Sequence, residues 1–158
     1  MCIRDRKQCD PSITRNSSND TPIHSASLNG HLEVVRFFIS ELNYDPIIPG
    51  RYKRTPLHSA ANQGHLNIIK YLIEEQNCNP SCLDEDNSTP LHEAARNGHI
   101  NIVKYLTIEK QCDPSITRNS NNDTPIHLAS LNGHLEVVRF LISELNCDPN
   151  IAKEHLFT

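Results

Sequence analysis

The amino-acid sequence predicts an all-α fold, a solenoid of stacked helix-turn-helix units with projecting β-hairpin loops. Two observations support this prediction. A tetrapeptide Thr-Pro-(Ile or Leu)-His recurs at spacings of 34, 34 and 35 residues, and each copy is followed six residues later by Gly-His. An apolar stripe with helical spacing then follows the Gly-His pair. A fixed period of this length is the signature of a stacked repeat protein. The four tetrapeptides are Thr21 to His24, Thr55 to His58, Thr89 to His92 and Thr124 to His127.

The first helix of each unit is expected to be short. Thr is a good N-cap and Pro is tolerated at the first helical position, so Thr21-Pro22 opens a helix. Gly30 can close it, because glycine readily adopts the left-handed backbone that ends many helices. The chain between these residues has room for about two helical turns.

The second helix of each unit has a broad apolar face, with apolar residues at i, i+3, i+6, i+7 and i+10. These residues are Leu32, Val35, Phe38, Ile39 and Leu42 in the first unit and Leu135, Val138, Leu141, Ile142 and Leu145 in the last. A helix shorter than about 12 residues is marginal alone in water. Neighbouring units must therefore cover this face, and stacking is expected to be the source of stability.

The combination of these features strongly resembles the ankyrin repeat. Besides the tetrapeptide and the Gly-His turn, each unit has a pair of Ala or Ser residues in its first helix and closes on Asp-Pro or Asn-Pro. The resemblance covers residues 7 to about 150. It implies a protein-interaction role, with partner contacts through the hairpin tips and the exposed side of the first helices, and neither a cofactor nor a reaction.

Segments rich in Asn, Asp, Pro and Ser join each second helix to the next threonine, and they are predicted to form projecting hairpin turns. Ankyrin repeats usually carry Gly at two left-handed positions of this segment, where this sequence has Asn, the usual non-glycine residue tolerated there. These residues are Asn43, Asn77 and Asn146 after the second helix, and Asn19, Asn87 and Asn122 before the threonine. The second unit has Gly50 where Asp is usual and Lys53 where Gly is usual, so its hairpin tip is expected to be remodelled.

The repeats divide the chain into segments. The four full repeats span 19–52, 53–86, 87–121 and 122–150, preceded by the remnant of another repeat at 7–18 and followed by a truncated tail at 151–158. Residues 1–6 are predicted to be a non-native leader, because they replace expected apolar helix residues and resemble a translated transposase sequencing adapter. These divisions predict an internal slice of a longer array, with apolar surface exposed at both ends.

Two stretches of the chain, 7–46 and 110–149, have nearly the same sequence. They differ only at the pairs Ser18/Asn121, Ser25/Leu128, Phe38/Leu141 and Tyr44/Cys147. A block of three repeats, 103 residues long, is therefore expected to have been duplicated.

Composition and charge argue against several classes of protein. A formal charge of −4 without a basic run argues against nucleic-acid binding, which usually shows clustered Lys or Arg. No apolar run approaches the roughly 20 residues of a membrane span, so this segment is not expected to insert into a membrane. The repeat pattern explains Cys9, Cys78, Cys112 and Cys147, which all lie two residues before the closing proline. We therefore expect reduced thiols, a cytoplasmic location and a monomeric array.

One near-match to a catalytic motif is present. The run from His92 to Arg96 lacks the second histidine that a zinc-protease helix needs four residues after the first. We expect each tetrapeptide histidine instead to bond the first-turn backbone or the capping threonine. Cys78 and Cys82 have no second pair of ligands at metal-site spacing. The sequence thus predicts no metal site, no cofactor and no enzymatic activity.

Surface variation on the constant frame marks the candidate partner-binding residues. The variable positions of the first helices are Ser25, Ser59, Glu93 and Leu128, and, three residues further on, Leu28, Asn62, Arg96 and Leu131. The hairpin tips add the basic run Arg51, Tyr52, Lys53 and Arg54 and the acidic run Asp84, Glu85 and Asp86. One interpretation is that these tips attract each other weakly, by about 0 to 1 kcal/mol when exposed. The other is a partner of alternating charge, anchored on Tyr52 and Leu128.

The function that the sequence favours is a protein-protein interaction scaffold that binds another protein through a concave face of hairpins and short helices. Two alternatives stay open. The array is a targeting or substrate-recruiting arm of a larger enzyme or channel, such as a kinase, ubiquitin ligase or membrane channel, whose active domain lies outside this segment. Alternatively, the array belongs to an effector that a microbe delivers into host cells.

Overall fold

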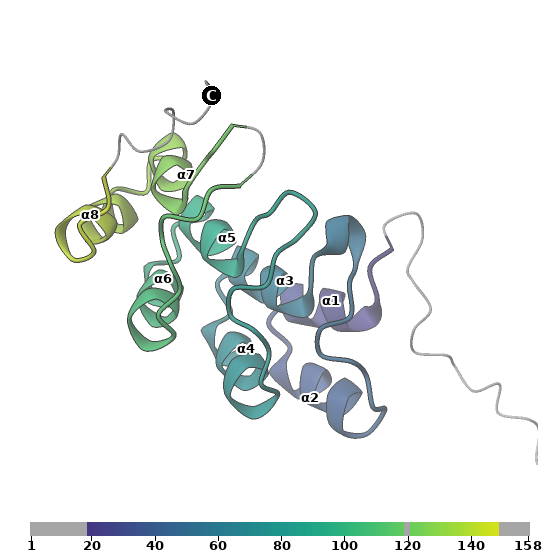
Figure 1. Ribbon diagram of the computed structural model, residues 1–158. Coiled ribbons are helices and arrows are strands. Elements are labelled where there is room, and N and C mark those ends of the chain that lie inside the picture. The colour runs from purple at the N-terminus through teal and green to yellow at the C-terminus, as the bar shows by residue number, and fades with distance from the viewer. Residues whose placement is uncertain (1–18, 119–120, 149–158) are drawn as a thin grey trace, which may run out of the picture.

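The computed structural model describes residues 19–118 and 121–148, and within them eight α-helices follow one another in pairs (Figure 1). The first helices of the four repeats are α1 (Pro22–Leu28), α3 (Pro56–Gln63), α5 (Pro90–Arg96) and α7 (Pro125–Leu131). The second helices are α2 (Leu32–Ser40), α4 (Leu66–Lys70), α6 (Ile100–Lys104) and α8 (Leu135–Ser143). The π-helical turns η3 (Tyr71–Glu75) and η4 (Tyr105–Glu109) extend α4 and α6, and the 3-10 turn η2 (Arg51–Lys53) precedes α3.

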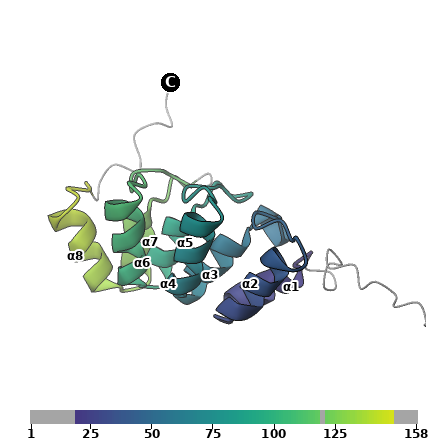
Figure 2. The same ribbon diagram turned by 90° about the horizontal axis from the view of Figure 1, so that it is seen from below.

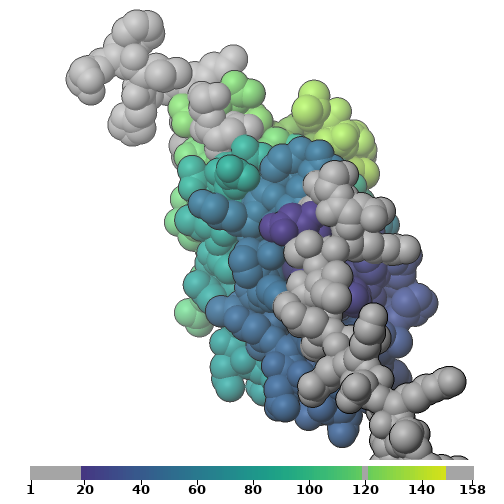
Figure 3. All heavy atoms as spheres, turned by 90° about the vertical axis from the view of Figure 1, so that its right-hand side faces the viewer, coloured from purple at the N-terminus to yellow at the C-terminus, as the bar shows by residue number. Residues whose placement is uncertain are grey.

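The helices form two layers. The first helices α1, α3, α5 and α7 pack side by side in chain order, and the second helices form the other row (Figures 1 and 2). Loops project beyond the row of first helices, on the side away from the second helices (Figure 1). Figure 3 looks at the stack from its N-terminal end, where the later repeats lie behind the first. The predicted all-α solenoid is confirmed.

Each first helix begins as the sequence predicts. A threonine with extended backbone occupies the N-cap, proline follows in the first turn, and the threonine and the tetrapeptide histidine form a reciprocal capping box. The Gly-His turn ends the helix. Gly64 has a φ of +87°, and a Cβ at this position would lie 2.8 Å from the ring of His99. Both the backbone angle and the lack of space therefore require glycine there.

The second helices of the middle repeats end in a wider turn than those of the outer repeats. In the second repeat the amide of Gln76 donates to the carbonyl of Tyr71, five residues back, at 3.2 Å. In the first repeat the amide of Glu41 donates to the carbonyl of Phe37, four residues back, at 3.0 Å. The apolar periodicity predicted these helices but did not predict the π-helical turns.

The loops adopt the left-handed residues that the sequence predicts. All six asparagines named above have φ between 51° and 59°, and Gln111 takes the same conformation (φ 54°) in the third repeat, where no glycine or asparagine is present. Tyr52 and Lys53 are both left-handed, so the tip of the second repeat is remodelled as expected. No strand forms among the described residues. The loops close by backbone bonds such as Asp84 N to Ser88 O (3.0 Å), and an isolated antiparallel bridge joins Arg118 and Asp123.

Three of the predicted segments lie outside the described residues, namely the leader at 1–6, the repeat remnant at 7–18 and the tail at 151–158. The boundaries of the four full repeats stay a prediction. The buried apolar residues follow the stack as a continuous row, since each repeat contributes one layer. The fully buried leucines of this row include Leu57, Leu72, Leu91 and Leu106.

Replacing Leu72 by alanine is expected to lower the free energy of unfolding by about 2 to 5 kcal/mol, because its buried side chain is lost from the middle of the stack. The matched control is Leu135→Ala on α8, where the leucine is 59% exposed and the expected cost is below about 0.5 kcal/mol. Urea unfolding of the two variants and the parent measures both values. Similar costs at the two positions would contradict the packing described here.

Candidate functional site

The tetrapeptide histidines connect each repeat to the next. Within the repeat the threonine hydroxyl lies 2.7 to 3.0 Å from the histidine Nδ1 in all four copies. The other ring nitrogen, Nε2, reaches a carbonyl of the loop that leads to the next pair of helices, with Arg54 O at 3.0 Å from His24, Ser88 O at 3.0 Å from His58 and Ile116 O at 2.9 Å from His92. The predicted bond to the capping threonine is confirmed, whereas the bond between repeats was not predicted.

These bonds fix the protonation state of the rings. A carbonyl oxygen can only accept, so Nε2 carries the proton, and Nδ1 accepts from the threonine amide, as from Thr89 N to His92 Nδ1 at 3.2 Å. Burial lowers the pKa of His92 to about 4 and also lowers the pKa of His24 and His58. A neutral imidazole with both nitrogens occupied has no lone pair for a metal ion. Among the described residues no cluster of His, Cys, Asp and Glu has the arrangement of a metal site.

The histidines of the Gly-His turns form a second set of contacts between repeats. The rings of His65, His99 and His134 each lie over the glycine of the preceding repeat, and each Nε2 donates to a carbonyl near the end of the preceding first helix. The bonds are His65 to Leu28 O (3.0 Å), His99 to Asn62 O (3.0 Å) and His134 to Arg96 O (2.9 Å). Two histidines per junction therefore connect adjacent repeats in opposite directions along the chain.

The charged residues between repeats 2 and 3 form a buried network. The guanidinium of Arg54 lies 2.8 Å from a Glu93 carboxylate oxygen and 3.3 Å from an Asp84 oxygen. The amide of Asn62 donates to the other Glu93 oxygen at 2.9 Å. Both carboxylates are buried. The basic and acidic loops therefore attract each other through Arg54, which contacts buried carboxylates. One interpretation of the sequence had placed this attraction between exposed tips.

Burial also corrects part of the predicted binding set. Asp84, Glu93 and Leu128 were predicted to contact a partner, but all three side chains are at most 5% exposed. A partner cannot reach them without unfolding the repeat, because these positions lie under the surface of the stack. Leu128 therefore does not serve as an anchor.

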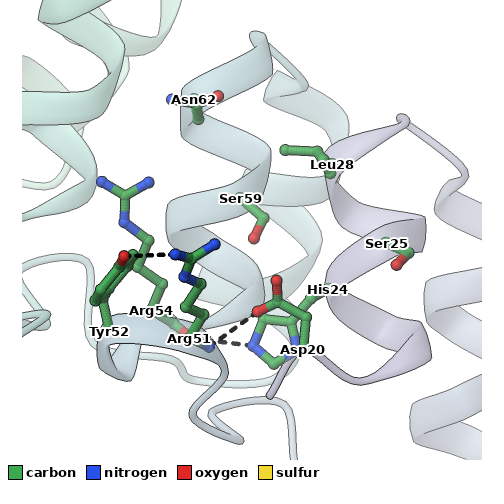
Figure 4. A pocket seen from close by; sticks show the side chains of 9 residues that line it. All are labelled: Asp20, His24, Ser25, Leu28, Arg51, Tyr52, Arg54, Ser59 and Asn62. Atoms are coloured by element: carbon green, nitrogen blue, oxygen red, sulfur yellow. Dashed lines mark hydrogen bonds between the residues drawn. The ribbon is translucent and has the colours of Figure 1, made fainter. Parts of the chain in front are cut away.

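Seven of the fifteen predicted residues come together around one hollow of about 250 Å³ between repeats 1 and 2 (Figure 4). They are Ser25 and Leu28 from α1, Arg51, Tyr52 and Arg54 from the following loop, and Ser59 and Asn62 from α3. Asp20 and His24 complete the lining, and the sequence reasoning missed both as site residues. His24 was expected only to bond the first-turn backbone or the capping threonine, and Asp20 was given no role. Below, the hollow means the space lined by these nine residues.

The tip of the second loop is held against the first repeat. The amide of Arg51 donates to Asp20 Oδ1 at 2.9 Å, and a Cβ on Gly50 would lie 2.4 Å from the same oxygen. The guanidinium of Arg51 lies over the Tyr52 ring, 4.6 Å from its centre, and donates to the Tyr52 hydroxyl at 2.7 Å. Tyr52 remains half exposed beside the hollow. The tip therefore presents an arginine and a tyrosine in a fixed arrangement.

The remaining predicted residues lie away from the hollow. Lys53, Glu85 and Asp86 are exposed on neighbouring loop tips, which are joined by a bond from Glu85 N to Tyr52 O at 2.8 Å. Arg96 on α5 is partly buried, and Leu131 at the end of α7 is 81% exposed. The structure thus brings together the predicted first-helix residues of repeats 1 and 2 with Arg51, Tyr52 and Arg54, and leaves the other predicted residues outside the hollow.

The described cysteines, Cys78, Cys82, Cys112 and Cys147, are free thiols. Burial raises the pKa of Cys78 to about 11, so this thiol is protonated and unreactive at neutral pH. Cys82 lies 3.7 Å from the hydroxyl of Thr55 and 3.8 Å from His58 Nδ1, against the helix cap at the start of the same repeat. Within the part of the chain that the structure describes, none of the helices has the length and apolar character needed to cross a membrane.

Comparison with known families gives one match. A family model described as ankyrin repeats in three copies matches the chain over residues 3–84 and again over residues 72–153. Together the two matches include every described residue. No curated protein matches the sequence.

The stability of the chain is expected to fall as the pH decreases from about 6.5 to about 4. The pKa of His92 is lowered to about 4 in the folded chain, so the unfolded chain takes up the proton first as the pH falls below 6.5. Stability is therefore complete above that pH, and the loss is on the order of 3 kcal/mol for this residue. Urea unfolding from pH 7.5 to pH 4 should show a smaller slope for His92→Asn than for the parent. Equal slopes would remove His92 from the explanation.

Replacing Arg54 by methionine is expected to destabilise the chain by about 1 to 3 kcal/mol, because two buried carboxylates lose their cation. The double variant Arg54→Met with Glu93→Leu should be more stable than Arg54→Met alone, because it removes one of the two unpaired carboxylates. It places leucine where repeat 4 has Leu128. The control is Lys53→Ala on the same loop, expected to change stability by less than about 0.5 kcal/mol. If the double variant is no more stable than the single one, the Glu93 carboxylate is not the group that Arg54 stabilises.

Proposed function

The chain belongs to the ankyrin-repeat family, and on this premise we propose that it is a scaffold that binds a partner protein through the hollow between repeats 1 and 2, without catalysing a reaction. Ankyrin repeats are a general protein-protein interaction module and typically carry no catalytic site. The observation that supports this site is the convergence of two first helices and one loop tip on a single open depression (Figure 4).

The side chains around the hollow have the character of a protein-binding site. Tyr and Arg are the residue types most enriched among binding hot spots, and Arg51 and Tyr52 stand together at the rim. Leu28 adds exposed apolar surface on the opposite helix. The volume of about 250 Å³ is below the roughly 300 to 1,000 Å³ of small-molecule sites, so it suits one or two side chains of a partner better than a cofactor.

The rim is pre-organised. Ordering a flexible side chain on binding costs about 0.5 to 1.5 kcal/mol, and a site already fixed in the free protein avoids part of this cost. The bond from Arg51 N to Asp20 and the stacking of Arg51 on Tyr52 fix both side chains before a partner arrives. Among the described residues neither Arg51 nor Lys53 has a carboxylate partner, whereas Glu85 and Asp86 stand exposed on the next tip. These charges favour a partner segment that carries both an acidic and a basic residue.

The same proposal includes a reducing, cytoplasmic setting. It is supported by the buried free thiols of Cys78 and Cys112, whose pKa values burial raises above their ordinary value. Such thiols persist in compartments that keep cysteines reduced.

Peptides selected from a random phage-displayed library against the full chain provide the test. Tyr52→Ala and Arg51→Glu are each expected to weaken the selected peptides about 30-fold, as the loss of a hot-spot residue worth about 2 kcal/mol would. Isothermal titration calorimetry measures the affinities, and circular dichroism checks that the variants keep the fold. The matched controls are Arg139→Glu and Ile142→Ala on α8, which are exposed and distant from the hollow. Peptides that are insensitive to both rim variants but sensitive to these controls would place the binding site elsewhere.

A further inference from the structure

Repeats 1 and 4 present nearly the same sequence to different neighbours. Each residue of α2 has a counterpart 103 positions later in α8, and Phe38/Leu141 is the only difference between these two helices. We define the N-side face of a repeat as the side toward the preceding repeat and the C-side face as the side toward the following one. Differences in exposure between counterparts then show what each neighbour covers.

The N-side face is covered in repeat 4 and open in repeat 1. Val137 is 1% exposed, whereas its counterpart Val34 is 43% exposed. Phe140 is 7% exposed beneath the ammonium group of Lys104 at 5.6 Å, whereas Phe37 is 52% exposed. Repeat 3 therefore supplies the cover for this sequence on its N-side.

The C-side face shows the opposite pattern. Ile39 is 8% exposed where repeat 2 covers it, and its counterpart Ile142 is 41% exposed. Leu28 is 40% exposed, and its counterpart Leu131 is 81% exposed. A Cβ on Gly30 would meet the ring of His65, whereas the corresponding space at Gly133 is open to 4 Å.

The contacts that repeat 2 makes on this face are specific. His65 lies over Gly30 and donates to Leu28 O at 3.0 Å. The guanidinium of Arg36 donates to both carboxylate oxygens of Glu75, at 2.7 and 3.1 Å, and lies 4.3 Å from the centre of the Tyr71 ring. Counted from the histidine as position 1, the three residues of repeat 2 that make these contacts are His65 at position 1, Tyr71 at position 7 and Glu75 at position 11.

The loop that leads into repeat 2 is also matched to the start of repeat 1. Gly50 leaves room for the Asp20 carboxylate and the His24 ring, since a Cβ there would lie 2.4 and 2.8 Å from them. The Arg51 amide then donates to that carboxylate. Repeat 4 carries the same two groups as Asp123 and His127.

We infer that the C-side face of repeat 4 is a docking surface for a helix pair with the facing chemistry of repeat 2. Its second helix begins with a histidine that lies over Gly133, followed by a tyrosine and a glutamate that receive Arg139, and its preceding loop carries a glycine opposite Asp123. The inference rests on the cover that this chain itself provides for the same sequence, and it is independent of the binding hollow.

A second copy of the chain fits this face less well. The open face that a second copy offers is the N-side face of repeat 1, with Val34 and Phe37 exposed. The same residues recur in repeat 4 as Val137 and Phe140, and there repeat 3 covers them. The surface that matches the N-side face of repeat 1 is therefore the C-side face of repeat 3. The N-side face of repeat 1 carries His31 and Glu41 at the positions of His65 and Glu75, but Phe37 replaces Tyr71, so it lacks one of the groups that the C-side face of repeat 4 is expected to receive.

The experiment is to extend the chain directly after Pro149, the counterpart of Pro46, with a copy of residues 47–80. The matched control extension is a copy of residues 12–46, which has nearly the same length and carries phenylalanine in place of Tyr71. Amide hydrogen exchange in α8 is expected to be at least about 10-fold slower with the repeat 2 extension than with the control, a difference of about 1.4 kcal/mol in local opening. Arg139→Ala should remove much of this protection and leave the exchange of the unextended chain unchanged.

Three results would overturn the proposal. The first is that the added copy of residues 47–80 leaves the α8 amides unprotected, whether or not the added segment folds. The second is equal protection by the two extensions, which would mean that the face accepts any repeat. The third is protection of α8 in the unextended chain that rises with protein concentration, detected together with dimers in sedimentation velocity, because a second copy would then occupy the face.

Discussion

The hydrogen bond from a buried, neutral histidine to the loop of the following repeat is the contact on which the rest of this structure depends. The same imidazole accepts from the threonine that caps its own helix and donates to a carbonyl of the next repeat, as His58 does toward Thr55 and Ser88. The cap of one helix and the position of the next loop are therefore set by one rigid ring. The ring must stay neutral to do both, because protonation of Nδ1 removes the acceptor that the threonine amide needs. Burial lowers the pKa values of His24, His58 and His92 and keeps these rings neutral near pH 7.

Local features of this fold could be predicted from the sequence because they depend on residues close together in the chain. The N-caps, the glycine at the end of each first helix and the left-handed asparagines belong to this group. Gln111 shows where such prediction stops. It takes a left-handed conformation that its residue type does not favour, because it occupies the turn that follows η4, at the end of the second helix of repeat 3. The network of Arg54, Asn62 and Glu93 joins residues 31 and 39 positions apart, so only the stacking distance between repeats reveals it. The burial of Leu128 could not be read from a position that is serine in two other repeats.

The place of the hollow follows from that same variable position. In the first two repeats the residue directly after the tetrapeptide histidine is a serine. The short side chains of Ser25 and Ser59 leave the hollow between these repeats open. The third repeat carries Glu93 at this position, and its carboxylate extends between the repeats to Arg54 and Asn62. One side-chain length per repeat thus decides whether a junction presents a depression or a charged network. Asn62 takes part in both, as a wall of the hollow and as a donor to Glu93, so the network also supports the rim of the binding site.

The junctions of this stack are not interchangeable, because the residue before each threonine meets a different group of the next loop. Asp20 receives the Arg51 amide beside Gly50, whereas Arg54 meets the carboxylate of Asp84. An acidic residue in place of Gly50 would bring two carboxylates together at the first junction, where even a Cβ would lie 2.4 Å from the Asp20 carboxylate. A glycine in place of Asp84 would leave Arg54 with Glu93 as its only carboxylate partner among the described residues and would remove the two turn bonds from Asp86 N and Ser88 N. The polar pairs in the loops therefore distinguish the first junction from the second, while buried apolar residues of the helices form the continuous core at both.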